Sequence, residues 1–373
     1  MNKTDNNTNV FFSLLRAGLW EQDVCLLPLG NFDYNEIYRM AEEQAVLGIV
    51  AAGLEHVVDL KAPQDVSLQI VGQTIQIERR NTAMNHFIGS LIDKMRNAGI
   101  YTLLLKGQGV AQCYEKPLWR ACGDVDFFLS DDNYEYAKNY LKPLTSSVDL
   151  EHIAEKHISM TIDGFVVELH GTLNAPLSFS IRKGLEEIKR AVFYEGKVRS
   201  WINGNTQVFL LNADEDAVYL FVHFFNHFYK EGVGLRQICD WCRLLWTYRD
   251  EIDVKKIENR VHKMGLMSEW KAFAALAVEY LGMPKEAMPF YSESICWKRK
   301  ADRIMEFILK SGNMGHNRDM SHFSKYPYLI RKCVSMGRRI GDLINHARIF
   351  PLDSLRFFPR IMFNGVRSAM RGE

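Results

Sequence analysis

The sequence has no long hydrophobic run, no disulfide framework and no excess of charge of either sign. No segment supplies the about 18 uninterrupted apolar residues that a membrane span needs, so no transmembrane segment is predicted. Residues 1–9 are polar and lack the basic and apolar regions of a secretory signal. Seven cysteines without framework spacing favour reduced thiols, so we expect a cytoplasmic protein. The net charge is only +1, so no global field indicates a nucleic-acid partner.

The composition that remains is that of a globular protein, with 47% hydrophobic and 24% charged residues. At 373 residues the chain exceeds one ordinary core, so we expect more than one packed region. Helical periodicity predicts an N-terminal helical region over 1–98 and a C-terminal helical domain over 213–373. Between them, residues 99–212 alternate strands and helices. The predicted fold class is therefore α+β, with a small mixed sheet and flanking helices between two helical regions.

Element boundaries follow from the same patterns. Helices are expected near 11–19, 34–57 and 68–98 in the first region, and near 107–114, 132–142 and 180–190 in the second. Strands are expected near 101–105, 124–130, 157–162, 165–170 and 206–211. Between two of these strands, Asp163-Gly164 is a strong signal for a hairpin with a type I′ turn. In the last region, Asn212 or Asp214 can cap a helix that runs to about Tyr229, and a second helix is expected near 235–248.

Two carboxylates, Asp124 and Asp126, stand two residues apart at the start of an apolar run. In a strand they would share one face, with Cα atoms roughly 6.5 Å apart, while Val125 and Phe127 would anchor the opposite face in a core. This spacing suits oxygen ligands for one or two hard cations. A solvated turn is the more common reason for an Asp-x-Asp pattern, and the pattern alone leaves that alternative open.

A third carboxylate, Glu168, lies on the strand predicted for 165–170 and shares a face with His170. If this strand neighbours the first, Glu168 completes a cluster of three carboxylates that could hold Mg²⁺ or Mn²⁺. Upstream, the Lys106-Gly107 turn and Arg120 add two cations and a backbone that can approach a ligand closely, as phosphate binding requires. Together these residues predict a site for metal and phosphate.

The segment LLLKGQGVAQCYEKPLWRACGDVDFFL, followed by KHISMTIDGFVVELHG, resembles an uncharacterised nucleotidyltransferase family that is itself similar to the DNA polymerase β superfamily. The resemblance covers roughly residues 10–280 and is most specific over 103–171. The residues that match the family pattern there are Lys106, Gly107, Arg120, Gly123, Asp124, Asp126, His157, Glu168 and His170. Downstream, His223, Arg236 and Asp240 match the family's helical region.

The resemblance implies a polymerase β-like nucleotidyltransferase core. The implied activity is the Mg²⁺-dependent transfer of a nucleoside monophosphate from ATP or another NTP to a hydroxyl or similar acceptor, with release of pyrophosphate. The acceptor could be a small molecule, a protein or RNA. The implied catalytic residues and metal ligands are Asp124, Asp126 and Glu168. The residues implied to hold the nucleotide phosphates are Lys106, Gly107, Arg120 and Gly123.

One departure from the superfamily pattern leaves alternatives open. The phosphate-binding turn is Lys106-Gly107 rather than Gly-Ser or Gly-Gly, so the serine hydroxyl that would contact phosphate is missing. A nucleotide-binding or scaffold protein without turnover is therefore an alternative. A toxin-like tRNA nucleotidyltransferase is a further alternative, because a similar Lys-Gly followed by Asp-x-Asp also occurs in nucleotidyltransferase toxins.

Other polar residues have two interpretations each. His157 and His170 could hydrogen-bond to a metal ligand and orient it, or be ordinary structural histidines. His223 could point into the cleft, while His223 and His227 as a metal pair is less favoured than ordinary hydrogen-bonded histidines. Arg236 and Asp240 are most simply an ion pair on a helix surface, with orientation toward the substrate as the minority view. Two other features are not expected to be functional: the CxxC formed by Cys239 and Cys242, and the aromatic cluster Phe221, Phe224, Phe225, Phe228 and Tyr229, which has core spacing.

A basic tail begins at about residue 316, with 11 Lys+Arg against 4 Asp+Glu up to residue 373. Its interleaved aromatic residues are Phe323, Tyr326, Tyr328, Phe350, Phe357, Phe358 and Phe363. Such a tail could contact an anionic membrane surface, RNA or an acidic protein partner. We favour the simpler interpretation, a helical appendage whose aromatic side chains pack on the preceding domain.

Overall fold

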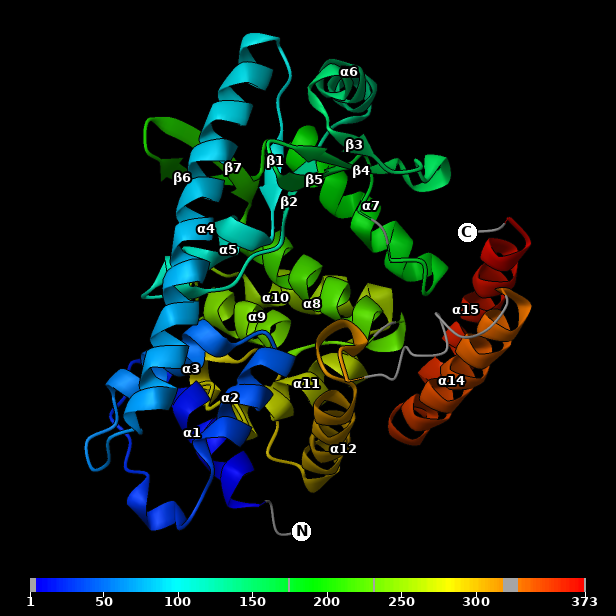
Figure 1. Ribbon diagram of the computed structural model, residues 1–373. Helices are drawn as coiled ribbons and strands as arrows, with labels where there is room; N and C mark the ends of the chain where they lie inside the picture. The colour runs from blue at the N-terminus through cyan, green and yellow to red at the C-terminus, as the bar shows by residue number, and fades with distance from the viewer. Residues whose placement is uncertain (1–4, 174, 231, 318–327, 372–373) are drawn as a thin grey trace.

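A seven-stranded mixed sheet forms the upper part of the computed structural model, which describes residues 5–173, 175–230, 232–317 and 328–371 (Figure 1). The strand order is β3-β4-β5-β2-β1-β7-β6. The strands are β1 (Leu103–Leu105), β2 (Asp124–Phe128), β3 (Ser147–Val148), β4 (His157–Ile162), β5 (Phe165–His170), β6 (Val198–Asn203) and β7 (Thr206–Leu211). All five predicted strands are present, whereas β3 and β6 were not predicted.

The central strand β2 lies between β1, its antiparallel neighbour, and β5, its parallel neighbour. Val125 and Phe127 are buried in a cluster with apolar side chains of α4 (Gln64–Asn97) and α6 (Asp131–Leu141), as the alternating pattern predicted. On the opposite face, Phe128 packs against Phe193 of α7 (Phe179–Phe193), with ring centroids 4.9 Å apart. The polar residues of β2 and β5 therefore face away from α4 and α6.

The β4–β5 hairpin turns at Asp163 and Gly164, whose φ angles are 50° and 80°. Positive φ at both central residues is what a type I′ turn requires, so this prediction is confirmed. The turn fixes the register of β5, and the parallel pairing of β5 with β2 then places Glu168 directly beside Asp126. The expected neighbourhood of the three carboxylates follows from this pairing.

The N-terminal helices are α1 (Asn6–Trp20), α2 (Tyr34–Glu43) and α3 (Leu47–Glu55), followed by α4, which extends from these helices to the sheet (Figure 1). The single helix expected over 34–57 was wrong, because the chain breaks at Ala45, where φ is 55°. Tertiary hydrogen bonds stabilise the break: the buried Gln44 side chain donates to Ile308 O and accepts from Leu235 N. No glycine or proline marks this position in the sequence.

The chain beyond the sheet is helical, as predicted. Its helices are α8 (Ala213–Lys230), α9 (Leu235–Thr247), α10 (Val254–Met264), α11 (Met267–Glu279), α12 (Ile295–Ser311), α14 (Tyr328–Ile349) and α15 (Pro351–Arg371). The Asn212 side chain accepts from Glu215 N at 3.2 Å and so provides one of the two predicted caps of α8. The aromatic cluster of α8 is buried, with Phe221, Phe224 and Phe225 fully inaccessible, which confirms its role in packing. Short 3-10 helices occur at Leu27–Leu29, Pro117–Trp119, Lys142–Leu144, Ile153–Glu155, Lys285–Ala287 and Asn313–Gly315.

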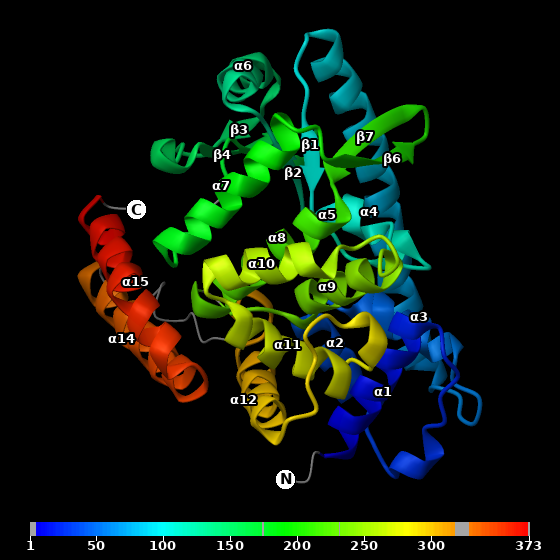
Figure 2. The same cartoon turned by 180° about the vertical axis from the view of Figure 1, so that it is seen from behind.

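Helices α14 and α15 form a hairpin at one edge of the molecule in both views (Figures 1 and 2). Phe350 and Phe357 of this hairpin are buried and contact Phe225 of α8, whereas Phe358 and Phe363 are exposed. Phe323 and Tyr326 lie outside the described residues, as does the side chain of Tyr328. Among the described residues, no helix is long and apolar enough to cross a membrane.

Candidate active site

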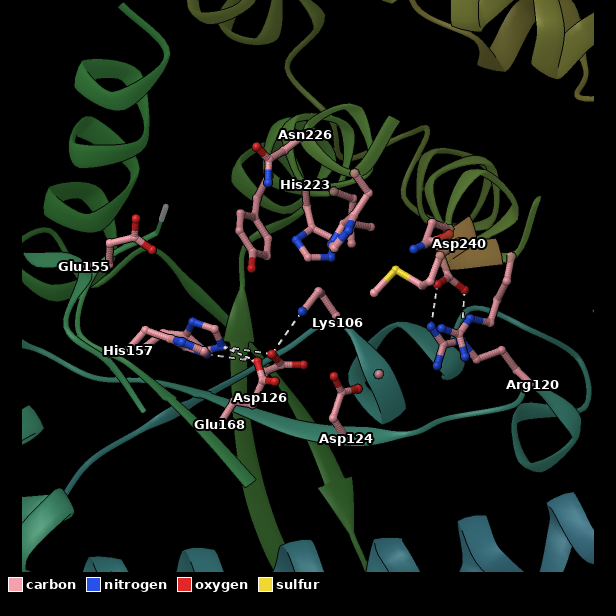
Figure 3. Close-up of a pocket in the computed structure, with 18 residues that line it drawn as sticks. Lys106, Arg120, Asp124, Asp126, Glu155, His157, Glu168, His223, Asn226 and Asp240 are labelled. Atoms are coloured by element: carbon pink, nitrogen blue, oxygen red, sulfur yellow. Dashed lines mark hydrogen bonds and ion pairs between the residues drawn. The ribbon is translucent and has the colours of Figure 1, made fainter. Parts of the chain in front are cut away.

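A pocket of about 250 Å³ lies between the β2–β5 face of the sheet and helices α8 and α9 (Figure 3). Every site residue predicted from the sequence except Gly123 lines this pocket. Its lining residues are Lys106, Gly107, Arg120, Asp124, Asp126, Glu155, His157, Glu168, His170, Tyr219, Leu220, His223, Asn226, His227, Arg236, Gln237, Asp240 and Met314. Residues from distant parts of the sequence therefore converge on one cavity.

The three predicted carboxylates lie together at the sheet end of this pocket. Ligand oxygens of Asp124, Asp126 and Glu168 all lie within 4.8 Å of one another. Asp126 is only 1% exposed, and its Oδ2 has no hydrogen-bond partner among the described residues. The charge of Asp126, together with burial, raises the pKa of Asp124 above its ordinary value. A divalent cation would offset this repulsion and complete the bonding of Asp126, so the donor set fits such an ion.

Lys106 follows β1 directly and reaches across to the carboxylates (Figure 3). Its Nζ lies 2.9 Å from Asp126 Oδ1. Burial, the largest single effect, would lower the pKa of Lys106, but the nearby negative charges of Asp126, Asp124 and Glu168 together with Tyr219 outweigh it and raise that pKa, so the ammonium group stays charged. The turn itself is unusual, because Lys106 and Gly107 have φ angles of 49° and 45°. A Cβ at Gly107 would lie 3.2 Å from Cys122 Sγ, so both backbone conformation and space favour glycine there.

The helix that follows, α5 (Gly107–Ala111), is shorter than the 107–114 segment expected. A five-residue helix has only a small dipole, so its N-terminus contributes little to anion binding. Gly123 does not line the pocket, and a Cβ at this position would meet no atom within 4 Å. Its predicted contact with phosphate stays a prediction.

Two imidazoles contact the carboxylates from β4 and β5. His170 Nε2 lies 2.9 Å from Asp126 Oδ1 and 3.4 Å from Glu168 Oε2, and His157 Nε2 lies 3.2 Å from the same Glu168 oxygen. Burial alone would raise the pKa of Glu168, but the hydrogen bonds with His157 and His170 outweigh it and lower that pKa strongly. Glu168 is therefore a stable carboxylate.

At the opposite end of the pocket, Arg120 and Asp240 form a buried ion pair (Figure 3). Arg120 donates from Nε to Asp240 Oδ1 at 3.0 Å and from a terminal nitrogen to Oδ2. Tyr114 also donates to Asp240 Oδ1, at 2.9 Å. The predicted surface ion pair between Arg236 and Asp240 was wrong, because Asp240 is 3% exposed and its carboxylate binds Arg120 and Tyr114.

Arg236 lines the same end of the pocket and donates from Nη1 to Ala121 O at 2.8 Å. Its buried Nε has no hydrogen-bond partner among the described residues. Burial, with the adjacent positive charge of Arg120, lowers the pKa of Arg236. Two guanidinium groups thus lie close to a single carboxylate, Asp240, which leaves this end of the pocket suited to an anion.

Helix α8 covers the pocket with polar side chains, most of which the sequence pattern did not identify as site residues. His223 was predicted, but Tyr219 and Asn226 were not, although they lie one turn before and after it. The sequence did contain a signal for them, because the three residues are polar and recur at helical intervals within a helix that is otherwise rich in aromatic residues. Burial, with the charge of Lys106, lowers the pKa of His223 well below its ordinary value, so this imidazole is neutral.

The same geometry bears on two minor interpretations, the His223–His227 pair and the CxxC of Cys239 and Cys242. The rings of His223 and His227 meet edge to face with centroids 4.6 Å apart. Among the described residues, neither histidine belongs to a group of three that could hold a metal ion. Cys239 and Cys242 are buried free thiols, and burial raises the pKa of both, so they have the features of core residues.

The chain is similar to a family of nucleotidyltransferases. No curated protein and no solved structure matches the chain. The model of an uncharacterised nucleotidyltransferase family matches residues 30–282, which is well over half of the sequence and includes the sheet and most of the pocket lining. The mixed sheet with flanking helices is consistent with a nucleotidyltransferase fold. The chain belongs to this nucleotidyltransferase family and is a transferase whose family implies a nucleotide substrate.

Proposed function

We propose that the protein transfers a nucleoside monophosphate from an NTP to a hydroxyl or similar acceptor in a reaction that depends on Mg²⁺ or Mn²⁺. One observation carries the proposal. Three carboxylates from β2 and β5 converge beside Lys106, and the most buried of them, Asp126, has an oxygen without a hydrogen-bond partner among the described residues. Carboxylates grouped beside a fixed cation are what a metal-assisted transfer of a charged phosphoryl group needs.

Asp124, Asp126 and Glu168 are the residues that would hold the divalent cation. When bound, the ion would supply positive charge to the triphosphate and favour ionisation of the acceptor hydroxyl. Glu168 could serve either as a ligand or as the base that accepts the hydroxyl proton. Its lowered pKa favours the ligand role, because a strongly acidic carboxyl group is a weak proton acceptor.

The cations of the pocket divide into two groups. Lys106 lies within reach of the carboxylates and would contact the phosphate nearest to them as a point charge. Arg236 and the Gly107 turn would complete the binding of the triphosphate, with an unused donor on Arg236 Nε. Most donors of Arg120 are directed to Asp240 and Ala121 O, so we assign Arg120 chiefly to positioning that end of the pocket. Charge that develops on the pyrophosphate leaving group would be stabilised by these groups.

The test is a variant with Asp124→Asn and Asp126→Asn. Both substitutions keep the side-chain volume and remove the charges, so we expect the folded variant to lose metal-dependent NTP binding and pyrophosphate release by at least 100-fold. Isothermal titration and a pyrophosphate assay with a panel of hydroxyl acceptors measure the two effects. Asp132→Asn, on the exposed first turn of α6, is the matched control. Transfer retained by the double variant would contradict the proposal.

The same experiment separates the alternative functions. Tight NTP binding by the wild-type protein without pyrophosphate release on any acceptor would favour a nucleotide-binding scaffold. Transfer to tRNA, with growth arrest on expression, would favour a toxin-like enzyme. The same assay, run with different acceptors and NTPs, would identify the acceptor and the preferred base. No motif among the pocket residues predicts either one.

A further inference from the structure

Two imidazole nitrogens and one carboxylate oxygen converge beside the three-carboxylate cluster. His157 Nε2 and His170 Nε2 lie 3.2 and 3.4 Å from the same oxygen, Glu168 Oε2. One ligand atom from each of the three residues lies within 4.8 Å of the others. Glu168 thus belongs to two ligand groups at once, one made of carboxylates alone and one with two histidines.

Two of the three separations among these atoms match the coordination shell of a small metal ion. Metal bonds of about 2.0–2.1 Å to nitrogen and oxygen in a tetrahedron place neighbouring ligand atoms about 3.3 Å apart. The two measured nitrogen–oxygen distances, 3.2 and 3.4 Å, lie on either side of this value. Little movement of the side chains is therefore needed to receive an ion.

The backbone holds the two histidines in this arrangement. His157 and His170 are directly paired across the antiparallel β4–β5 hairpin, and their ring centroids are 4.8 Å apart. Glu168 is on the same strand and the same face as His170, two residues before it. Ligands on paired strands are more rigidly placed than ligands on loops.

The neighbouring Asp126 adds an observation that also fits a cation at this end of the pocket. Asp126 is nine-tenths or more buried, its Oδ1 contacts His170 Nε2 at 2.9 Å, and its Oδ2 has no hydrogen-bond partner among the described residues. The group with two histidines and the group of three carboxylates differ in their ligand chemistry, however. Imidazole nitrogen favours transition-metal ions, whereas carboxylate oxygen favours Mg²⁺ and Mn²⁺.

We propose that His157, Glu168 and His170 form a second metal site, which takes a divalent transition-metal ion of the Zn²⁺ and Co²⁺ type. The histidines are direct ligands in this site rather than supports of a carboxylate. Glu168 bridges to the neighbouring position held by Asp124 and Asp126, and that one feature rests on the proposed function. The chain would then combine one position for a hard cation with one for a transition-metal ion.

The experiment uses the full-length, metal-free protein titrated with Co²⁺, whose visible absorption becomes intense when the ion leaves its six-coordinate aqua shell for a four-coordinate site. We expect one equivalent of Co²⁺ to give a visible band in the wild-type protein and Zn²⁺ to displace it. His157→Gln should weaken Co²⁺ binding by at least 10-fold. The matched control is His152→Gln, because His152 is an exposed imidazole that stacks on His157 at 5.9 Å and belongs to no ligand group among the described residues.

Thermal unfolding checks that each variant is folded, and His170→Gln repeats the test from the other imidazole. A band that is absent in the wild-type protein, or that persists unchanged in both His157→Gln and His170→Gln, would overturn the inference.

Failure of the second metal site can be distinguished from failure of the proposed function. Mg²⁺-dependent nucleotidyl transfer without Co²⁺ binding would leave the function and remove the second site. Co²⁺ binding that depends on both histidines, in a protein without transfer, would do the reverse.

Discussion

If the proposed function holds, Lys106 is the residue at which nucleotide binding and metal binding would compete. Its ammonium group lies 2.9 Å from Asp126 Oδ1, where a cation bound by the carboxylates would also contact the protein. Because neighbouring carboxylates raise the pKa of Lys106, the competition cannot be relieved by deprotonation at neutral pH. In the proposed reaction a bound triphosphate would offer the ammonium group a different anion. Lys106 would then neutralise Asp126 in the free protein and release it when substrate and metal bind.

The expected result of Lys106→Met follows from this competition. Mg²⁺ binding in the absence of nucleotide should become several-fold tighter, because a positive charge leaves the site, while NTP binding should weaken by at least 10-fold. Isothermal titration with Mg²⁺ alone and with an NTP measures both changes. Lys61→Met, at an exposed position, is the control. Weaker binding of Mg²⁺ alone by Lys106→Met would show that Lys106 supports the metal site rather than competing with it.

At the scale of elements, the sequence predicted most of what forms the site. Alternation in β2 and β5 and the Asp163-Gly164 turn predicted which faces carry the three carboxylates, and the parallel pairing of β2 with β5, which no local pattern predicts, brings them together. The edge strand β6 was missed although its residues alternate, because Val198 and Ile202 are exposed and the run is as polar as a loop. The Arg120–Asp240 pair was also missed, since 120 residues separate its members and no local pattern connects them.

This ion pair joins α9 to the segment before β2, and its energetics can be tested. Asp240→Ala leaves the Arg120 guanidinium buried without its carboxylate, so we expect a loss of about 3–5 kcal/mol in the free energy of unfolding. Removing both charges with Arg120→Met and Asp240→Ala should cost less than Asp240→Ala alone. Urea denaturation of the two variants measures the difference. Equal losses would mean that the buried charge of Arg120 is compensated by other groups.

At the scale of the whole molecule, one buried apolar cluster contains side chains from the N-terminal helices, the sheet, the C-terminal helices and the α14–α15 hairpin. Its members include Phe11, Leu105, Phe221 and Phe357. The division of the chain near residues 98 and 212 stays a prediction. Long-range packing of this kind is invisible to local periodicity, which identifies a buried face but not its partner.

The position of the hairpin separates two interpretations of the basic tail. We expect Phe357→Ala, at a fully buried position, to cost about 3–5 kcal/mol and to accelerate proteolysis on the C-terminal side of α12. Phe363→Ala, at a side chain that is 66% exposed, should change neither. Binding to anionic vesicles tests the alternative interpretation, in which the tail contacts a membrane surface. If the tail contacts membranes, Phe363→Ala would weaken vesicle binding while leaving proteolysis unchanged.

Helix α8 contacts the pocket on one side and the α14–α15 hairpin on another. Tyr219, His223 and Asn226 line the pocket, while Phe225 contacts Phe350 and Phe357 of the hairpin. Any shift of this helix changes both environments together. Thermodynamic linkage then requires reciprocity. A ligand in the pocket that binds best with α8 in its present position would stabilise the packing of the hairpin against α8. A partner that displaces the hairpin would weaken the binding of that ligand by the same factor.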